Sequence, residues 1–330
     1  MSKLKLSLAI GDYDRNRPVI DGRVSIDGVD PRVMTLSPEE MFFRAMRHEA
    51  FDVCELSLSS FVLRVSRGDN PYVGIPVFLS RAFRHASVIV HRNSGIETPA
   101  DLRGKRVGIP EWQLTANVWT RAFLRDDFGV EATDIHWLRG GIEDPGRVEK
   151  LKLDLPDNLI IEDIPQDRSL NDMLNNGEID AFIGPRAPSC FTIDNPNLRW
   201  LFKDPTQAAL ESYSKTKIFP IMHLLGVRRS LAEENPWLPV ALQKAFTQSK
   251  ALAEAALADT SATKVTLPFV EEQLRRVHTH MGKDFWSYGA AENAHVLKYF
   301  LHQHHAQHLS KRVVEMEELF HPSTLEGFKI

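Results

Sequence analysis

Segments typical of buried β-strands alternate with helical segments in two successive stretches, and this alternation constrains the fold more than any other feature. In the first stretch, Leu4–Ile10 and Phe51–Leu56 are predicted strands with a helical segment between them. In the second stretch, Lys105–Ile109 and Ile179–Ile183 repeat the pattern. The alternation predicts an α/β protein with mixed, mostly parallel sheets flanked by helices.

The two stretches predict two lobes, and a chain of 330 residues is long enough for both. The strand-like run Lys217–Val227 follows the second stretch and is expected to return to the first. We therefore expect residues 1–92 and 205–330 to form lobe I, with a helical C-terminal part, and residues 93–204 to form lobe II. Two chain crossings predict a ligand cleft between the lobes, at the carboxyl ends of the strands.

Charge and composition exclude several classes of protein. Forty Lys and Arg against 44 Asp and Glu leave a formal charge of −4, so neither nucleic acid nor an anionic membrane is expected as a partner. Two cysteines are too few for a disulfide framework or a thiolate zinc site. The first apolar run, Leu6–Ile10, is too short for a secretory leader, and no run approaches the roughly 20 apolar residues of a membrane helix. A cytoplasmic protein is therefore expected.

Two arginines and a histidine surround a phenylalanine at the end of a predicted strand. In Arg81-Ala82-Phe83-Arg84-His85, an extended backbone would place Arg81, Phe83 and His85 on one face. Arginine binds carboxylates through paired, charge-assisted hydrogen bonds. The segment predicts a carboxylate clamp with an aromatic floor, and the alternative is a solvated loop with surface ion pairs.

Two further strand ends carry candidate binding residues. Glu111, Trp112 and Thr115 stand where a helix begins after a strand, and free N–H groups at such a helix start favour anions. Glu111 is also a candidate base, although an acidic residue near a helix start is common for helix stability alone. Gly184 and Arg186 end another strand, where glycine permits close approach of a ligand.

A histidine and two serines complete the candidates at strand ends. His223 lies in an apolar strand-like run, where histidine is usually a hydrogen-bonded core residue. If that strand borders the cleft, His223 becomes a proton-transfer group. Ser59 and Ser60 stand at a predicted strand-to-helix junction and are candidate anion donors.

No metal site is assigned. The run from His302 to His308 holds four histidines at helical spacing, but it lies in a helical tail, and exposed helix surface is the favoured interpretation. No Walker loop, GxGxxG, GxSxG or HExxH motif occurs in the sequence. No cofactor is expected, and dependence on a divalent metal stays open.

Several segments together resemble the 4,5-dihydroxyphthalate decarboxylase family, whose members are similar in fold to type 2 periplasmic binding proteins. The matching segments extend over nearly the whole chain, and three of them, SRAFRH, GPRAPS and IFPIMH, are specific in combination. The segments are CELSLSS from Cys54, FLSRAFRHAS from Phe78, DLRGKRVGIPEWQLTANVW from Asp101, GPRAPS from Gly184, KTKIFPIMH from Lys215, ENPWLP from Glu234 and MGKDFWSYG from Met281.

The resemblance implies a carboxy-lyase of aromatic, phthalate-type catabolism that converts 4,5-dihydroxyphthalate into protocatechuate and carbon dioxide. The alternative is a non-catalytic two-lobed receptor for an aromatic carboxylate, similar to the binding proteins of ABC transporters. A homo-oligomer stays open. For the enzyme, chemistry assigns carboxylate binding to Arg81, Arg84 and Arg186, with Thr115, Ser59 and Ser60 in support. It assigns proton transfer to His223, His85 or Glu111, and ring packing to Phe83 and Trp112.

Overall fold

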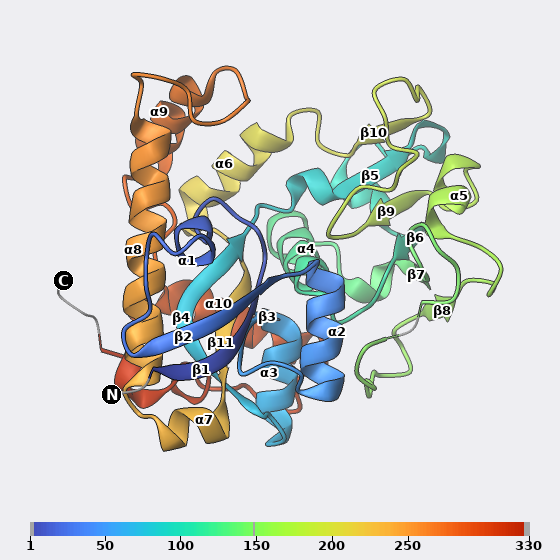
Figure 1. Ribbon diagram of the computed structural model, residues 1–330. Coiled ribbons are helices and arrows are strands. Elements are labelled where there is room, and N and C mark those ends of the chain that lie inside the picture. The colour runs from blue at the N-terminus through green and yellow to red at the C-terminus, as the bar shows by residue number, and fades with distance from the viewer. Residues whose placement is uncertain (1–2, 148, 327–330) are drawn as a thin grey trace. The chain divides into compact units, whose positions relative to one another are not determined.

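The computed structural model describes residues 3–147 and 149–326 and divides the chain into two compact units (Figure 1). Unit 1 comprises Met1–Arg81, Ile221–Lys298 and Val314–Ile330, and unit 2 comprises Ala82–Pro220 and Tyr299–Val313. These bounds differ from the expected lobes, because β5 (Val88–His91) pairs with strands of unit 2. Residues 299–313 also belong to unit 2.

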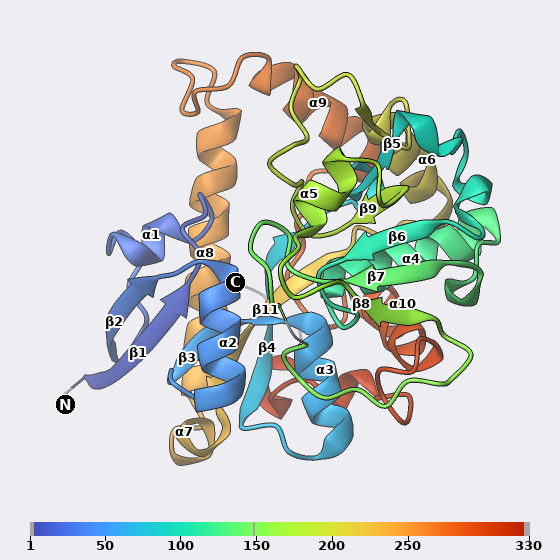
Figure 2. The ribbon, with the colours of Figure 1, turned by 90° about the vertical axis from the view of Figure 1, so that its right-hand side faces the viewer.

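Unit 1 is built on a five-stranded mixed sheet in the order β2-β1-β3-β11-β4. Strand β1 is parallel to both β2 and β3, whereas β11 is antiparallel to both β3 and β4. Figures 1 and 2 show α2 and α3 on one face of this sheet and α8 on the other. The strands are β1 (Leu4–Ile10), β2 (Val29–Thr35), β3 (Val53–Ser57), β4 (Tyr72–Arg81) and β11 (Ile221–Arg228), and the helices that lie wholly in unit 1 are α1 (Arg17–Ile20), α2 (Pro38–His48), α3 (Leu58–Arg67), α7 (Arg229–Glu234), α8 (Leu238–Ala258) and α9 (Val270–Met281).

Unit 2 contains a six-stranded sheet in the order β10-β5-β9-β6-β7-β8. Strand β6 is parallel to β7 and β9, and β5 is antiparallel to β9 and β10. Two mixed sheets with flanking helices confirm the predicted α/β class. The remaining strands are β6 (Arg106–Ile109), β7 (His136–Arg139), β8 (Ile161–Asp163), β9 (Ala181–Ile183) and β10 (Leu198–Trp200), and the helices are α4 (Thr115–Phe128), α5 (Leu170–Asn175) and α6 (Pro205–Thr216).

Helix α10 (Ala294–Ala306) passes through the boundary between Lys298 and Tyr299. Its second half packs in unit 2, where Phe300 lies beside Trp119 of α4 with ring centroids 5.1 Å apart. Short 3-10 helices occupy His85–Ser87, Arg92–Ser94, Pro99–Leu102, Ala132–Asp134, Met316–Glu318 and Pro322–Thr324.

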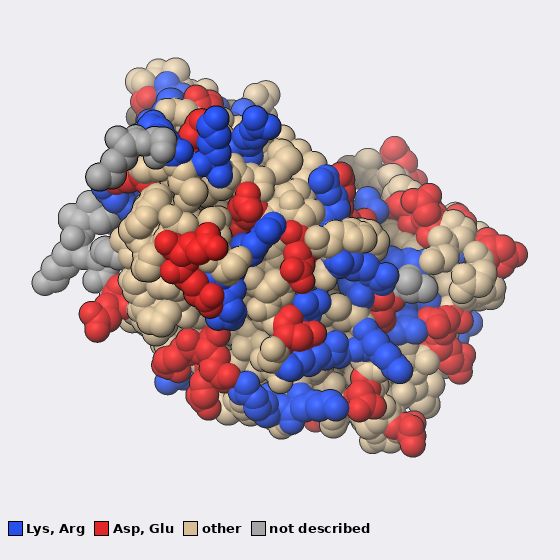
Figure 3. Space-filling view, turned by 60° about the horizontal axis from the view of Figure 1, so that its bottom comes forward, with Lys and Arg blue, Asp and Glu red and all other residues tan. Residues whose placement is uncertain are grey.

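Basic and acidic side chains are interspersed on the face drawn in Figure 3, as the nearly balanced composition predicts. Among the described residues, the helices are all too short or too polar to span a bilayer.

Candidate functional site

Glu55 and His223 form a hydrogen-bonded pair on adjacent strands of unit 1. Glu55 lies opposite Leu225 across the β3–β11 ladder, and His223 lies opposite Ser57. Glu55 and His223 are therefore diagonal neighbours on the same face of the sheet, within reach of each other for long side chains. Nδ1 of His223 lies 2.6 Å from Oε1 of Glu55. The β11–β4 register shifts on both sides of His223, an irregularity that can redirect a side chain next to an active site.

Glu55 also receives hydrogen bonds from the segment that follows β1. The amide N–H of Gly11 donates to Oε2 at 3.0 Å, and the hydroxyl of Tyr13 donates to Oε1 at 3.0 Å. The Tyr13 ring folds back over Gly11, where an added Cβ would lie 2.3 Å from Cζ of the ring. Glycine at position 11 therefore allows Tyr13 to reach the carboxylate.

The electrostatics of the pair fix the direction of its hydrogen bond. Glu55 is fully buried, which opposes ionisation, yet hydrogen bonds from His223, Gly11 and Tyr13 and the charge of His223 hold its pKa below the usual range. Burial and the charge of Glu55 raise the pKa of Tyr13. An ionised carboxylate only accepts, so Nδ1 of His223 donates and the exchangeable position is Nε2.

Phe42 contacts His223 in unit 1, and helix α3 begins directly after Ser57, which lies opposite His223. The Phe42 ring meets the imidazole of His223 edge-on, with centroids 4.7 Å apart. Ser57 is the N-cap residue of α3, and Ser59 and Ser60 are buried in its first turn. The edge where β3 ends thus combines an imidazole with the N–H groups of a helix start, an arrangement suited to binding an anion and moving a proton.

Arg81 and Arg15 have different surroundings in unit 1. Arg81 is buried at the end of β4 and donates to the carbonyl of Ser287 at 2.7 Å and to the side chain of Asn293, which favours a packing role over the predicted clamp. The guanidinium of Arg15 lies between two rings, 4.4 Å from the Tyr13 centroid and 4.2 Å from that of Trp286.

In unit 2, Phe83 and His85 belong to aromatic clusters. Phe83 stacks on Phe219 at 4.7 Å, and His85 stacks on Phe123 at 4.5 Å. His85 is only 4% exposed, and burial lowers its pKa to about 4. It is therefore neutral near pH 7, which argues against a role as proton donor.

Arg84 and the segment Gly184–Arg186 come together in unit 2. Nη1 of Arg84 donates to the carbonyl of Pro185 at 3.1 Å, and burial lowers the pKa of Arg84 to about 10. Gly184 is buried, and an added Cβ there would lie 2.4 Å from the Phe182 ring, so packing alone accounts for the glycine. Arg186 is exposed after the end of β9.

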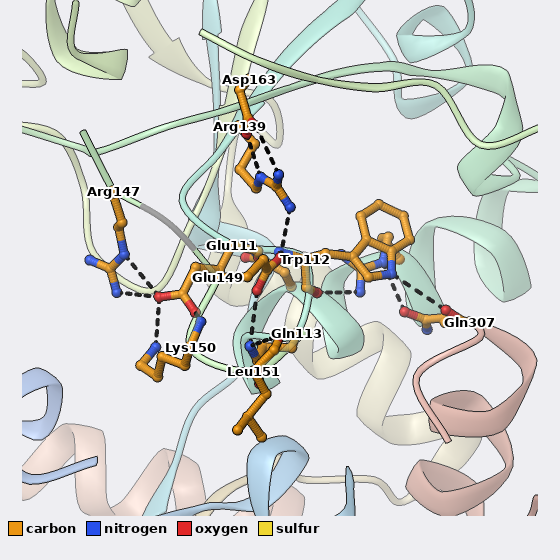
Figure 4. Close-up of polar contacts among 12 residues, drawn as sticks. Glu111, Trp112, Gln113, Arg139, Arg147, Glu149, Lys150, Leu151, Asp163 and Gln307 are labelled. Carbon is orange, nitrogen blue, oxygen red and sulfur yellow. Dashed lines mark hydrogen bonds and ion pairs between the residues drawn. The ribbon is translucent and has the colours of Figure 1, made fainter. Parts of the chain in front are cut away.

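Glu111 lies within a charge network of unit 2 (Figure 4). Its Oε1 accepts from Arg147 Nη2 at 2.6 Å and from Lys150 Nζ at 2.7 Å, and its Oε2 accepts from the Lys150 amide. Glu149 accepts from Trp112 N and Gln113 Nε2, and burial, followed by the charge of Glu111, raises its pKa. Because both carboxylate oxygens of Glu111 are engaged by Arg147 and Lys150, the network favours a structural role for Glu111.

Trp112 and Thr115 are both buried at the β6–α4 junction. Arg121 lies over the Trp112 ring at 3.6 Å, and Trp137 meets that ring edge-on at 5.5 Å. The structure therefore surrounds Trp112 with protein groups. Thr115 is the first residue of α4.

The histidine run of α10 is not uniformly exposed. His304 is fully buried beside Phe300, whereas His302, His305 and His308 are exposed, so the interpretation as surface helix is wrong for His304. Across residues 3–147 and 149–326, no group of three or more His, Cys, Asp and Glu side chains is placed to hold a metal ion.

Sequence reasoning missed Glu55, Tyr13 and Arg15. A glutamate inside the otherwise apolar run Phe51–Leu56 is a signal that could have identified Glu55, because a buried charge needs partners. Tyr13 and Arg15 stand in a polar loop, where the local sequence carries no such signal.

No family model matches the chain. In fold, the chain is similar to the periplasmic aliphatic sulphonate-binding protein SsuA of Escherichia coli, with a TM-score of 0.55, 14% identity, and coverage of 98% of this chain and 99% of that one. This likeness confirms the predicted similarity to periplasmic binding proteins and shows the fold alone.

Two curated proteins are much closer in sequence. The chain is 58% identical over 330 residues to the 4,5-dihydroxyphthalate decarboxylase of Comamonas testosteroni, covering all of both chains. It is 54% identical over 213 residues to the 4,5-dihydroxyphthalate decarboxylase of Pseudomonas putida, covering 64% of this chain and 83% of that one. The chain therefore belongs to the 4,5-dihydroxyphthalate decarboxylase family.

Proposed function

We propose that this protein is a carboxy-lyase that converts 4,5-dihydroxyphthalate into protocatechuate and carbon dioxide without oxidation. The observation that carries the proposal is the 58% identity, over the full length of both chains, to a curated 4,5-dihydroxyphthalate decarboxylase. The alternative of a non-catalytic receptor rests on fold similarity at 14% identity and is not favoured.

The reaction replaces one carboxylate of the ring by a proton. The hydroxyl para to the departing carboxylate donates electron density as its proton is withdrawn, and the ring carbon that bears the carboxylate takes up a proton. The carbon–carbon bond then breaks, carbon dioxide leaves, and the bonding pair restores the aromatic ring and the phenolate. The protein must hold the retained carboxylate, accept hydrogen from the hydroxyl and supply a proton to the ring carbon.

We assign proton transfer to Nε2 of His223. Because Nδ1 donates to the ionised Glu55, the carboxylate holds the ring in one orientation and stabilises the imidazolium. The Gly11 amide and the Tyr13 hydroxyl in turn fix Glu55. The proposal gives no step to His85 or Glu111, which are enclosed by aromatic rings and by cations respectively.

We assign carboxylate binding to Arg186 and to the N–H groups at the starts of α3 and α4. Arg186 is supported by its exposure after β9, and the helix starts by the positive end of the helix dipole next to Ser59, Ser60 and Thr115. Replacing Arg186 by Ala is expected to raise KM steeply, whereas an unchanged kcat/KM would remove Arg186 from the assignment.

The decisive experiment follows protocatechuate and carbon dioxide after purified protein is mixed with 4,5-dihydroxyphthalate, with and without EDTA. If the protein forms neither protocatechuate nor carbon dioxide, whether EDTA is present or absent, the proposed function is refuted. His223→Gln is expected to lower kcat at least about 100-fold while substrate binding stays within a few-fold. His302→Gln, an exposed histidine in α10, is the matched control and should retain full activity.

We also propose that the enzyme acts in the cytoplasm. Cys54 and Cys190 are both free thiols, which is typical of a reducing compartment. Fractionation of producing cells tests the location, and light scattering of the purified protein measures its oligomeric state.

A further inference from the structure

Arg121 is a buried cation of unit 2, and its hydrogen-bond acceptors among the described residues are uncharged. It lies on α4 and is 4% exposed. Its Nε donates to Oε1 of Gln307 at 2.8 Å, and its Nη2 donates to the carbonyl of Trp112 at 2.8 Å. Its third nitrogen, Nη1, is buried and has no hydrogen-bond partner within the described part of the chain.

This arrangement leaves positive charge without a bonded counter-charge. The Trp112 ring, 3.6 Å from the guanidinium carbon, offsets only part of the lost hydration. Glu149 attracts Arg121 from a distance, but its own oxygens accept from Trp112 N and Gln113. Burial accordingly lowers the pKa of Arg121 to about 9. A buried guanidinium of this kind would gain from an anion placed at Nη1.

A pocket of unit 2 brings Arg121 next to both polar and apolar groups. Gln303 contributes an oxygen, Oε1, that is itself buried and has no partner within 3–147 and 149–326. The apolar part of the lining comes from Pro156, Leu159 and Ala306, and Trp112 and Gln307, which also line the pocket, are labelled in Figure 4. A buried cation and apolar side chains thus line the same pocket.

We propose that this pocket binds a small monocarboxylate, whose carboxylate accepts a hydrogen bond from Nη1 of Arg121 and whose carbon skeleton contacts Leu159, Pro156 and Ala306. One unfilled cationic nitrogen matches one carboxylate. A second negative charge is disfavoured because Glu131, also in the lining, carries a charge of the same sign. The apolar walls favour a carbon skeleton over inorganic phosphate.

The inference does not depend on the proposed decarboxylation, because Arg121, Leu159 and Ala306, on which it rests, have no role in that reaction. Benzoate is the first probe, acetate tests the need for a carbon skeleton, and protocatechuate tests whether the product of the proposed reaction is a ligand. Benzamide, a neutral mimic of benzoate, tests the need for charge.

Titration calorimetry on the full-length protein tests the site with two variants and a control. Arg121→Gln removes the cation, and Ala306→Phe fills the pocket from an exposed position. Arg125→Gln is the matched control, because Arg125 also lines the pocket but pairs with Asp126 at 2.7 Å. Benzoate is expected to bind saturably, at least tenfold more weakly in Arg121→Gln and Ala306→Phe and within threefold of wild type in Arg125→Gln.

Three outcomes would overturn the inference. They are the absence of saturable benzoate binding to the wild-type protein, equal binding of benzamide, and benzoate affinity unchanged in Ala306→Phe. The Ala306→Phe measurement decides the question even if Arg121→Gln does not fold, because residue 306 is exposed and the substitution leaves Arg121 in place.

Discussion

Glu55 is a charged residue in the middle of a fully buried strand, and its three donors keep it ionised. Replacing it by Gln keeps the side-chain size but removes the charge that faces the imidazole of His223. We expect Glu55→Gln to lower kcat about 100-fold or more and to change KM little, because a neutral amide stabilises the imidazolium poorly. Steady-state kinetics measure this, with exposed Glu317→Gln as control. A kcat within threefold of wild type would contradict the orienting role.

His85 links the stability of unit 2 to pH. Its pKa is lowered to about 4 in the folded state by burial, from an ordinary value of about 6.5. Between about pH 4 and 6.5 the unfolded chain binds a proton at His85 more readily than the folded protein does. The contribution of His85 to the free energy of unfolding is therefore complete above about pH 6.5 and is lost as the pH falls towards 4. We expect His85→Phe, which keeps a ring against Phe123, to remove about 2–3 kcal/mol of this pH dependence. Urea unfolding at pH 7, 6, 5 and 4.5 measures it, and an unchanged slope would refute a buried neutral imidazole.

At the level of single residues, the sequence indicated what chemistry a side chain could perform better than it indicated which other residue contacts that side chain. His223 was identified as a proton-transfer candidate, but its partner Glu55 lies 168 positions away, and their contact depends on the register of β11 against β3. Arg81 and Glu111 have the predicted chemistry, yet Asn293 and Arg147 bind them through contacts that no local pattern encodes. Pairing between distant segments therefore decides which charged side chains are bound by other side chains of the protein.

Among the helices, the start of α5 depends on one buried serine. Ser169 is the N-cap residue: its hydroxyl oxygen accepts from the Asp172 amide at 3.1 Å, and its hydroxyl donates to the Asp172 carboxylate at 2.8 Å. We expect Ser169→Ala to lower the free energy of unfolding by about 1–2 kcal/mol, because the helix loses its cap in a buried setting. Ser37→Ala at the exposed start of α2, where the cap hydrogen bond is 3.4 Å long, should lower the free energy of unfolding by less. Urea unfolding compares the two variants, and an equal loss of unfolding free energy in both would contradict the role of burial.

Element prediction succeeded where periodicity was strong. The predicted strand Leu4–Ile10 coincides with β1, and the strand expected within Lys217–Val227 is β11, Ile221–Arg228. Periodicity could not show that β5 joins the second sheet, because that pairing with β9 and β10 is antiparallel and depends on segments about 90 residues or more further along the chain. The same limit explains why the expected lobe boundary at residue 92 differs from the observed division at Arg81.

At the scale of the whole molecule, unit 2 is completed by a segment from the far end of the chain. The expected helical tail instead returns residues 299–313 to unit 2, where Tyr299 bonds Asp126 and Gln307 bonds both Arg121 and the Val118 carbonyl. Because α10 is continuous through Lys298 and Tyr299, the same helix also contributes its first five residues to unit 1. Loss of packing in the second half of α10 should therefore destabilise both units.

Phe300→Ala tests this coupling, since Phe300 is fully buried against Trp119. We expect a loss of about 3–5 kcal/mol in unfolding free energy from the cavity left behind. Hydrogen exchange followed by mass spectrometry should show faster exchange in β6 of unit 2 and also in β1 of unit 1, because fraying of α10 spreads through a cooperative helix. Phe182→Ala in β9, equally buried but outside α10, should affect β6 far more than β1. Faster exchange confined to β6 in Phe300→Ala would show that the two units unfold independently despite the shared helix.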